Sequence, residues 1–166
     1  EAVTADSRGT LVCLDGGGAE EWVWESPTTL NSPPTIADMD GDGAPEVLVG
    51  GPDAPVYCLS GAGALRWQTG MGGGQGTGPV VADLDNDGAP EILVGIDNDL
   101  ACLDNQGQTR WRVAMNTPVD NGIAVGDADG DGAPEIYAAD TAGLLVSVTP
   151  GGEVRWRGDV EEDRKS

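Results

Sequence analysis

The stretch "DLDNDGAPEILVG" covers residues 83 to 95 and has two close relatives elsewhere in the chain. The stretches "DMDGDGAPEVLVG" and "DADGDGAPEIYAA" begin at Asp38 and Asp127, so the acidic segment recurs after 45 and then 44 residues. A fixed period of this length is typical of solenoids, propellers and other repeat arrays. We therefore expect one structural unit repeated along the chain.

Tryptophan and glycine follow the same period. Four tryptophans are separated by 45, 44 and 45 residues, and a glycine lies four residues before each of them. The tryptophans are Trp22, Trp67, Trp111 and Trp156, and the glycines are Gly18, Gly63, Gly107 and Gly152. Because the tryptophan recurs in every unit, we expect it to pack between neighbouring units, whereas a ligand-binding residue would more often be unique.

Each period contains four short apolar stretches, which in one unit read "PVVAD", "EILVGI", "LACLD" and "TRWRV". Each has the length of a strand, is rich in branched residues and is bounded by Gly, Asp or Asn. None has a 3.6-residue apolar period long enough for a helix. Four strands in about 45 residues predict an all-β fold, a β-propeller of four-stranded blades.

We expect the blades to form a single domain over residues 1–166. We expect a partial blade at 1–26, complete blades at 27–71, 72–115 and 116–160, and a tail at 161–166. Glu1 corresponds to the ninth position of an acidic loop, so the first strand of the opening blade is missing and the array has nearly four blades. Propellers of this kind usually have about six to eight blades. Further blades of a longer chain, or self-association of neighbouring copies, are therefore expected to complete the ring.

Composition limits the partners of this chain. It has 166 residues with 27 Gly, 11 Pro and no His or Phe, and its formal net charge is -21. Nucleic acid and anionic lipid would be repelled by such a charge. No apolar run approaches the ~18 residues of a membrane span, so membrane insertion is not expected. Cations are the natural partners.

The basic residues and cysteines also follow the repeat. Arginine precedes Trp67, Trp111 and Trp156, and strand alternation places Trp and Arg on opposite faces, where the charges would discourage edge-to-edge pairing. Cys13, Cys58 and Cys102 hold equivalent positions on different blades, beyond the ~7 Å limit for a disulfide. We expect them to be reduced, buried core residues. No catalytic or cofactor-binding residue is predicted.

The acidic loops have the composition of a calcium site. Calcium takes six to eight oxygen ligands, and Asp at positions 1, 3 and 5 of a tight loop turns three carboxylates inward. Glycine at position 6 permits the sharp turn, the carbonyl at position 7 is a further ligand, and an acid at position 9 closes the shell. Three Ca²⁺ sites are thus predicted, at Asp38, Asp40, Asp42, Ala44 and Glu46; at Asp83, Asp85, Asp87, Ala89 and Glu91; and at Asp127, Asp129, Asp131, Ala133 and Glu135.

Three other interpretations fit the loops less well. An EF-hand needs flanking helices and a glutamate at position 12, where this chain has Val49, Val94 and Ala138. Magnesium prefers to keep bound waters and fits an all-protein cage less well. Asp, Asn and Gly also build ordinary acidic turns, but four acids converging without a cation would repel one another.

These loops resemble the FG-GAP/VCBS repeats of bacterial and archaeal surface proteins, the blade type of the integrin alpha-subunit propeller. The threefold "D-x-D-x-D-G-A-P-E" pattern carries the resemblance. The family implies a loop that joins the first and second strands of a blade and holds Ca²⁺. Glu46, Glu91 and Glu135 stand where integrin blades usually have Asp. The segments "LVCLDGGGAEEW" and "LACLDNQGQTRW" also resemble a packing motif of quinoprotein-type propellers, without implying a quinone.

The expected function is that of a non-enzymatic, calcium-stabilised scaffold, adhesion or binding module, outside the cell or on its surface, for a protein or glycan partner. Loops 27–35 and 69–79 are candidate contact surfaces, with simple connectors the favoured interpretation. The alternative is the propeller portion of a secreted polysaccharide lyase-like enzyme, for which the chain offers no histidine base. A redox quinoprotein is disfavoured because the chain is too short to enclose the cofactor.

Overall fold

The computed structural model describes residues 2–51, 54–69 and 78–159. This part of the chain forms fifteen β-strands and no helix, and so contains no helix able to cross a membrane. The strands are β1 Ala2–Ala5, β2 Thr10–Leu14, β3 Glu20–Glu25, β4 Thr35–Ala37, β5 Glu46–Val49, β6 Tyr57–Leu59, β7 Leu65–Gln68, β8 Val80–Ala82, β9 Glu91–Ile96, β10 Asp99–Leu103, β11 Thr109–Ala114, β12 Val119–Gly126, β13 Glu135–Asp140, β14 Leu144–Val148 and β15 Val154–Asp159.

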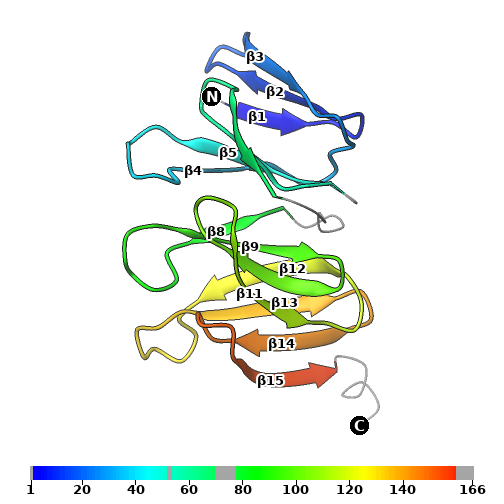
Figure 1. Ribbon diagram of the computed structural model, residues 1–166, viewed down its shortest axis with the longest axis vertical. Helices are drawn as coiled ribbons and strands as arrows, with labels where there is room; N and C mark the ends of the chain where they lie inside the picture. Colours follow the sequence, from blue (N-terminus) through cyan, green and yellow to red (C-terminus); the bar gives the residue numbers. More distant parts are fainter. Residues whose placement is uncertain (1, 52–53, 70–77, 160–166) are drawn as a thin grey trace.

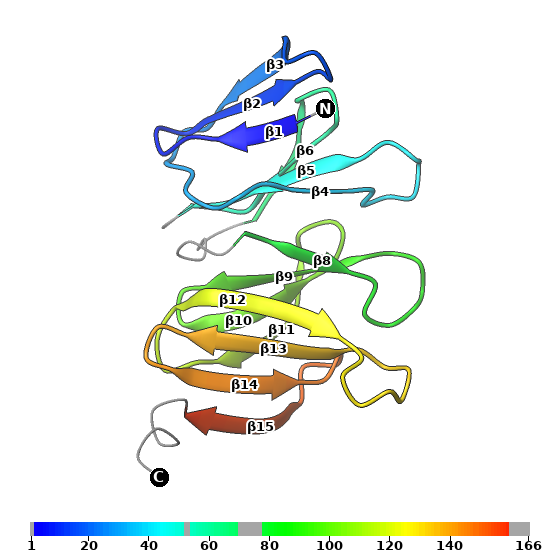
Figure 2. The ribbon, with the colours of Figure 1, turned by 180° about the vertical axis from the view of Figure 1, so that it is seen from behind.

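The strands form four antiparallel sheets that are stacked face to face in a row (Figure 1). The first sheet has three strands in the order β1-β2-β3, and the other three have four strands each in sequence order. Both views show the sheets following one another along the long axis in chain order (Figure 2). The prediction of four-stranded propeller blades, with one blade lacking its first strand, is confirmed.

A recurrent tight turn joins the third strand of each unit to the fourth. In the first sheet, Oδ1 of Asp15 accepts hydrogen bonds from the backbone N–H groups of Gly17 and Ala19, both at 2.8 Å. Gly18 closes this turn with a φ of 82°, a left-handed conformation that glycine adopts without steric cost. The turns at Gly63, Gly107 and Gly152 have the same form, with φ values of 79°, 79° and 88°.

The core lies between the sheets, in one hydrophobic cluster for each pair of neighbours. Leu11 of the first sheet packs with Val47, Val49 and Tyr57 of the second. Equivalent clusters join the second sheet to the third and the third to the fourth. Every internal sheet therefore buries both faces, which explains why β5 and β9 are buried at every position and have no alternating pattern.

Three of the four fourth-strand tryptophans pack between sheets, as predicted, whereas Trp156 on the last sheet is 45% exposed. The ring of Trp22 lies against Gly63 of the next sheet, and its Nε1 donates a hydrogen bond to the carbonyl of Gly61 at 2.8 Å. The ring of Trp67 lies against Gly107. Trp111 lies against Gly152, and its Nε1 donates to the carbonyl of Pro150 at 2.8 Å. We call this contact, a tryptophan packed on the turn glycine of the next sheet, the Trp–Gly joint.

The three cysteines are reduced and buried, as predicted. Burial raises the pKa of Cys58 and of Cys102 to about 12, so neither thiol forms a thiolate at neutral pH. We expect a thiol-specific colorimetric reagent at neutral pH to leave the folded protein unmodified and to modify three thiols after unfolding in denaturant. Rapid reaction of the folded protein would contradict this burial.

Candidate metal centre

The three acidic loops connect the first two strands of the second, third and fourth sheets. They project on the same side of the stack, one below the other, in both views (Figures 1 and 2). The fourth and sixth residues of each loop need a left-handed backbone. Glycine provides it at most of these positions, and in the second loop Asn86 does so with a φ of 59°, as asparagine tolerates.

The first aspartate of each loop holds the turn closed. Oδ1 of Asp38 accepts the backbone N–H of Gly41 at 2.8 Å, and Oδ2 accepts that of Gly43 at 2.9 Å. Asp83 and Asp127 make the corresponding bonds to the sixth residue of their loops. The aspartate at loop position 5 binds the backbone of position 7 in the same way. Oδ1 of Asp42, Asp87 and Asp131 accepts the N–H of Ala44, Ala89 and Ala133, respectively.

The ninth residue of each loop is a buried glutamate at the start of the second strand. Glu46, Glu91 and Glu135 are only 1%, 3% and 2% exposed. One oxygen of each, Oε2, accepts the N–H of the second loop residue at 2.9 Å, from Met39, Leu84 and Ala128 respectively. The other oxygen, Oε1, is left for a different partner.

The structure brings most of the predicted ligands together, in two patterns. Carboxylate oxygens of Asp38, Asp40 and Asp42 lie within 4.8 Å of one another in the first loop. In the other two loops the cluster contains the glutamate at position 9 and not the aspartate at position 5. The second cluster is Asp83, Asp85 and Glu91, and the third is Asp127, Asp129 and Glu135. All three clusters could hold a metal ion, and they do not include the fourth acid of each loop, which is Glu46, Asp87 or Asp131.

An arginine from the fourth strand of the same sheet reaches each loop. Nη1 of Arg66 lies 2.5 Å from Oδ2 of Asp40 and 3.1 Å from Oε1 of Glu46. Arg110 pairs in the same way with Asp85 and Glu91, and Arg155 with Asp129 and Glu135. Sequence reasoning placed these arginines on the strand edge and missed their partners. The available signal was that arginine precedes tryptophan only in the three units with a full acidic loop, whereas Glu21 precedes Trp22.

The arginine affects the acids according to their exposure. The hydrogen bond from Arg66 holds the pKa of Asp40 below its ordinary value, and Arg110 does the same for Asp85. Burial raises the pKa of Glu91 despite a hydrogen bond from Leu84 and the nearby Arg110 charge. One guanidinium therefore does not fully compensate the buried carboxylate, and each loop has four acids for a single arginine.

The first loop offers the clearest fit for a further cation. Oε1 of Glu46 is buried and accepts no hydrogen bond, although the Arg66 guanidinium is close by. A buried carboxylate oxygen without a hydrogen bond is costly, and a hard divalent cation prefers such an oxygen. The donor set of each loop, four carboxylates on a rigid turn, consists of oxygen atoms only and suits calcium better than zinc or copper.

Comparison with known families identifies the repeat. The model of the FG-GAP-like repeat matches residues 38–94 and 83–138, which together cover more than half of the chain. The chain belongs to the FG-GAP-like repeat family. Both matched FG-GAP segments start at the first aspartate of an acidic loop and end in the second strand of the following sheet. No curated protein matches the chain.

Solved structures with the same fold are β-propellers. BamB from Moraxella catarrhalis is 23% identical with a TM-score of 0.71, over 95% of this chain and 49% of its own. BBS1N, in complex with ARL6DN, is 16% identical with a TM-score of 0.72, over 96% of this chain and 52% of its own. A europium-containing methanol dehydrogenase is 14% identical with a TM-score of 0.68, over 95% of this chain and 39% of its own. The FG-GAP chain thus spans about half the length of the first two propellers.

Proposed function

We propose that this protein is a non-enzymatic, calcium-stabilised propeller scaffold that acts outside the cell or on its surface and presents its loops to a protein or glycan partner. The observation that carries the proposal is the threefold acidic loop, which has four carboxylates and one arginine that pairs with only two or three of them. Three bound Ca²⁺ ions would occupy the sites at the ligands predicted from the sequence. Each ion would tie the first strand of a blade to the second.

The calcium proposal links stability to location. A site filled at 100 times its Kd stabilises the folded state by about 2.7 kcal/mol. Extracellular calcium sites have Kd values of about 10⁻⁴–10⁻³ M, so weak sites are useful mainly where calcium is abundant. A scaffold with three such sites is best suited to the outside of the cell. The propeller neighbour BBS1N, solved in complex with ARL6DN, is a precedent for a protein partner on this fold.

Catalysis has less support. The acids of the loops are engaged by arginines and by backbone N–H groups of the loops themselves. The cavity of about 360 Å³ on the fourth sheet is lined by Gly122, Ile123, Ala124, Tyr137, Ala138, Ala139 and Leu145, none of which is a carboxylate, thiol or amine. Most of the candidate contact loop 69–79 lies outside the described part of the chain, since residues 70–77 are not described.

The test is calcium titration of chelator-stripped protein, with magnesium as the control ion. We expect isothermal titration calorimetry to give three Ca²⁺ per chain and thermal unfolding to shift upward with calcium but not with magnesium. Asp85→Asn should remove or weaken one of the three sites. Asp99→Asn is the matched control, because it removes the same charge from β10 of the same sheet, outside the loop.

Two results would overturn the proposal. If elemental analysis and calorimetry found no calcium at millimolar concentration, the loops would be acidic turns held by arginine alone. If Asp99→Asn reduced the calcium stoichiometry as much as Asp85→Asn, the ions would be neutralising the general negative charge and would not occupy the loops.

A further inference from the structure

Each acidic loop is already engaged by a positive charge of the chain itself. In the second loop, Nη2 of Arg110 lies 2.9 Å from Oδ2 of Asp85, and Nη1 pairs with Oε1 of Glu91. Asp85 and Glu91 are two of the three acids in the cluster that could hold a metal ion. The guanidinium therefore binds the same carboxylates that a metal ion in this cluster would need.

The buried glutamate of this loop has both carboxylate oxygens engaged. Oε2 of Glu91 accepts the N–H of Leu84 at 2.9 Å, and Oε1 pairs with Arg110. Glu135 of the third loop is held in the same way. A metal ion that takes Oε1 as a ligand must therefore displace the guanidinium or share that oxygen with it.

Displacement is the more favourable of these two arrangements. A divalent ion and a guanidinium on one oxygen are like charges a few ångströms apart, and they repel more strongly beside a buried group than in water. The side chain of Arg110 is 43% exposed, whereas that of Glu91 is 4% exposed. The arginine can thus turn into solvent without disturbing a strand, but the glutamate cannot leave the loop.

The first loop has the same competition and an independent sign of a stronger cation. Arg66 pairs with Asp40 at 2.5 Å and lies 3.9 Å from Asp42, so it again contacts two of the three acids of the cluster. Oε1 of the buried Glu46 lies 3.1 Å from Nη1 of Arg66 but accepts no hydrogen bond. The guanidinium therefore leaves one buried ligand oxygen unsatisfied, which a divalent ion would use.

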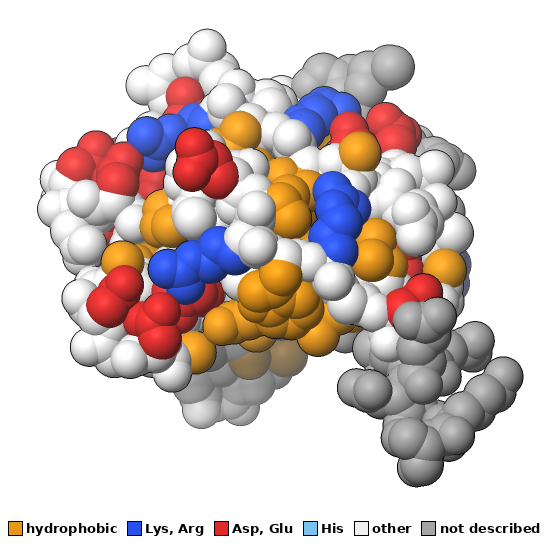
Figure 3. All heavy atoms as spheres, turned by 90° about the horizontal axis from the view of Figure 1, so that it is seen from below, with side chains coloured by type: hydrophobic (Ala, Val, Ile, Leu, Met, Phe, Trp, Pro, Cys, Tyr) orange, Lys and Arg blue, Asp and Glu red, His pale blue; other side chains and the backbone are white. Residues whose placement is uncertain are grey.

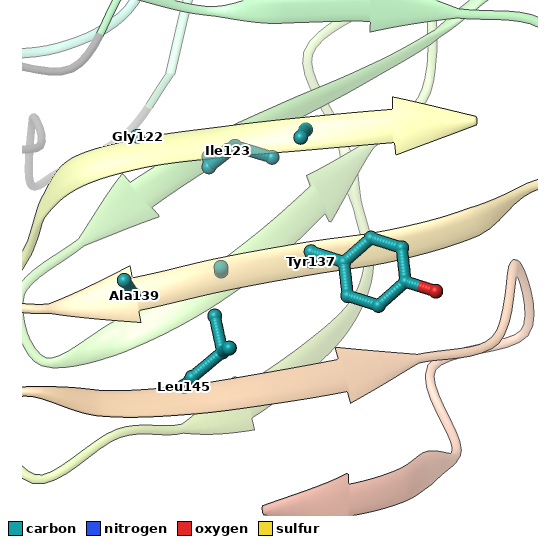
Figure 4. Close-up of a pocket in the computed structure, with 7 residues that line it drawn as sticks. Gly122, Ile123, Tyr137, Ala139 and Leu145 are labelled. Carbon is teal, nitrogen blue, oxygen red and sulfur yellow. The ribbon is translucent and has the colours of Figure 1, made fainter. Parts of the chain in front are cut away.

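The third loop repeats the pairing at the end of the stack. Viewed from this end, basic side chains lie beside acidic ones (Figure 3). The shallow cavity on the fourth sheet is lined by uncharged side chains, among them Ile123 and Tyr137 (Figure 4). Nη1 of Arg155 lies 3.3 Å from Oδ2 of Asp129 and 2.6 Å from Oε1 of Glu135. All three arginines thus pair with the acids of the loop in their own sheet.

We propose that Arg66, Arg110 and Arg155 are tethered cations that compete with Ca²⁺ for the loop carboxylates. The guanidinium holds each loop when calcium is scarce and is displaced into solvent when calcium binds. This inference rests on the proposed function, because it describes the regulation of the same calcium sites. The competition weakens each site, so that the loops fill only where calcium is abundant, and it preserves the folded loop below that concentration.

The test is the calcium affinity of Arg110→Met, measured by isothermal titration calorimetry at about 0.15 M salt, where the general field of the protein is largely screened. Methionine keeps an unbranched side chain but removes the charge. We expect three Ca²⁺ per chain in the wild type and in the variant, with one site at least about tenfold tighter in the variant.

Arg112→Met is the matched control for this measurement. It removes the same charge two residues further along β11, on the same face of the strand. The side chain of Arg112 is 40% exposed, and its partner is Asp99 at 3.7 Å, outside the acidic loop. Because only the general charge changes, the calcium affinity should change by less than about twofold.

Thermal unfolding provides a second measurement. In chelator, Arg110→Met should melt below the wild type, because the buried Glu91 loses its cationic partner. At saturating calcium this difference should disappear, because the ion then neutralises the same carboxylates. A purely structural role of the arginine would leave the difference unchanged by calcium. Circular dichroism checks that both variants keep the fold.

The outcomes separate this inference from the calcium proposal on which it rests. If the wild type bound three Ca²⁺ and Arg110→Met bound them no more tightly, the competition would be wrong while the calcium-stabilised scaffold stood. Equal tightening by Arg112→Met would also overturn the competition, as an effect of net charge. If only Arg110→Met bound calcium, the competition would be supported and the scaffold proposal would fall. If neither bound calcium, both would fall.

Discussion

Gly107→Ala is expected to destabilise the protein by about 3 kcal/mol, since overpacking and left-handed strain both cost energy at this site. A Cβ at Gly107 would lie 2.6 Å from Cε3 and 2.7 Å from Cζ3 of Trp67. The ring cannot easily retreat, because it packs against the buried core between the second and third sheets. For a chain of this size, the expected fall in melting temperature is about 10 °C.

Gly18→Ala separates the two contributions. Gly18 closes the same kind of turn with a φ of 82°, but no atom lies near its added Cβ. This variant should lose only the conformational part, about 1 kcal/mol. Both variants are compared by urea unfolding. Equal losses in the two would mean that the tryptophan moves aside and that the Trp–Gly joint contributes little to stability.

The joint also shows what a periodic sequence can and cannot predict. The period of tryptophan and glycine indicated repeated packing between blades, because every unit has the same need. The spacing of four residues within a unit, however, does not pair Trp67 with Gly63. The structure pairs Trp67 with Gly107, one period later, because Gly63 and Trp67 belong to one hairpin while the ring points to the next sheet. Only the stacking direction of the sheets decides between these partners.

The fold was predictable because its signals are local and are repeated. The same sequence pattern occurs in four successive units, and it predicts four strands per unit with the first strand of the opening unit missing. The observed sheets, one of three strands and three of four strands, confirm this prediction. The acidic loops were predictable as clusters for the same reason. Their arginines were not, because Arg66 lies 26 residues from Asp40 along the chain. The contact depends on a long side chain crossing from the fourth strand to the loop, a geometry that spacing alone does not fix.

A second residue missed in the sequence is Asp140, at the end of β13. It is fully buried, and its carboxylate accepts four backbone hydrogen bonds. Oδ1 accepts the N–H of Ala142 at 3.0 Å and of Leu144 at 2.8 Å, and Oδ2 accepts the N–H of Asn116 at 3.1 Å and of Thr117 at 3.0 Å. The side chain thus ties the β11–β12 connection to the β13–β14 turn. The first blade has Asp6 at the equivalent position, where Oδ1 accepts the N–H of Arg8 and Thr10. The second and third blades have Gly51 and Ile96 there, so the aspartate does not recur in every unit.

Asp140→Asn is expected to destabilise the protein by about 3 kcal/mol. The asparagine amide has one oxygen that accepts hydrogen bonds and one NH2 group that does not, so two of the four backbone N–H groups would lose their partner. Asp120→Asn is the matched control, because Asp120 is an exposed carboxylate on β12 of the same sheet. It should change the free energy of unfolding by less than about 0.5 kcal/mol. A loss in Asp140→Asn no larger than in the control would show that water replaces the four bonds.

The same carboxylate should make the stability depend on pH. Burial acts to raise the pKa of Asp140, but the bonds from Leu144, Thr117 and Asn116 outweigh it and hold the pKa below the ordinary 3.8. A carboxyl with a lower pKa in the folded state stabilises it above the unfolded pKa, and this contribution disappears as the pH falls through the folded pKa. The stability gap between the wild type and Asp140→Asn should therefore be constant at neutral pH and narrow below about pH 4. A gap that stayed the same down to the lowest pH at which both proteins fold would mean that the bonds act without the charge.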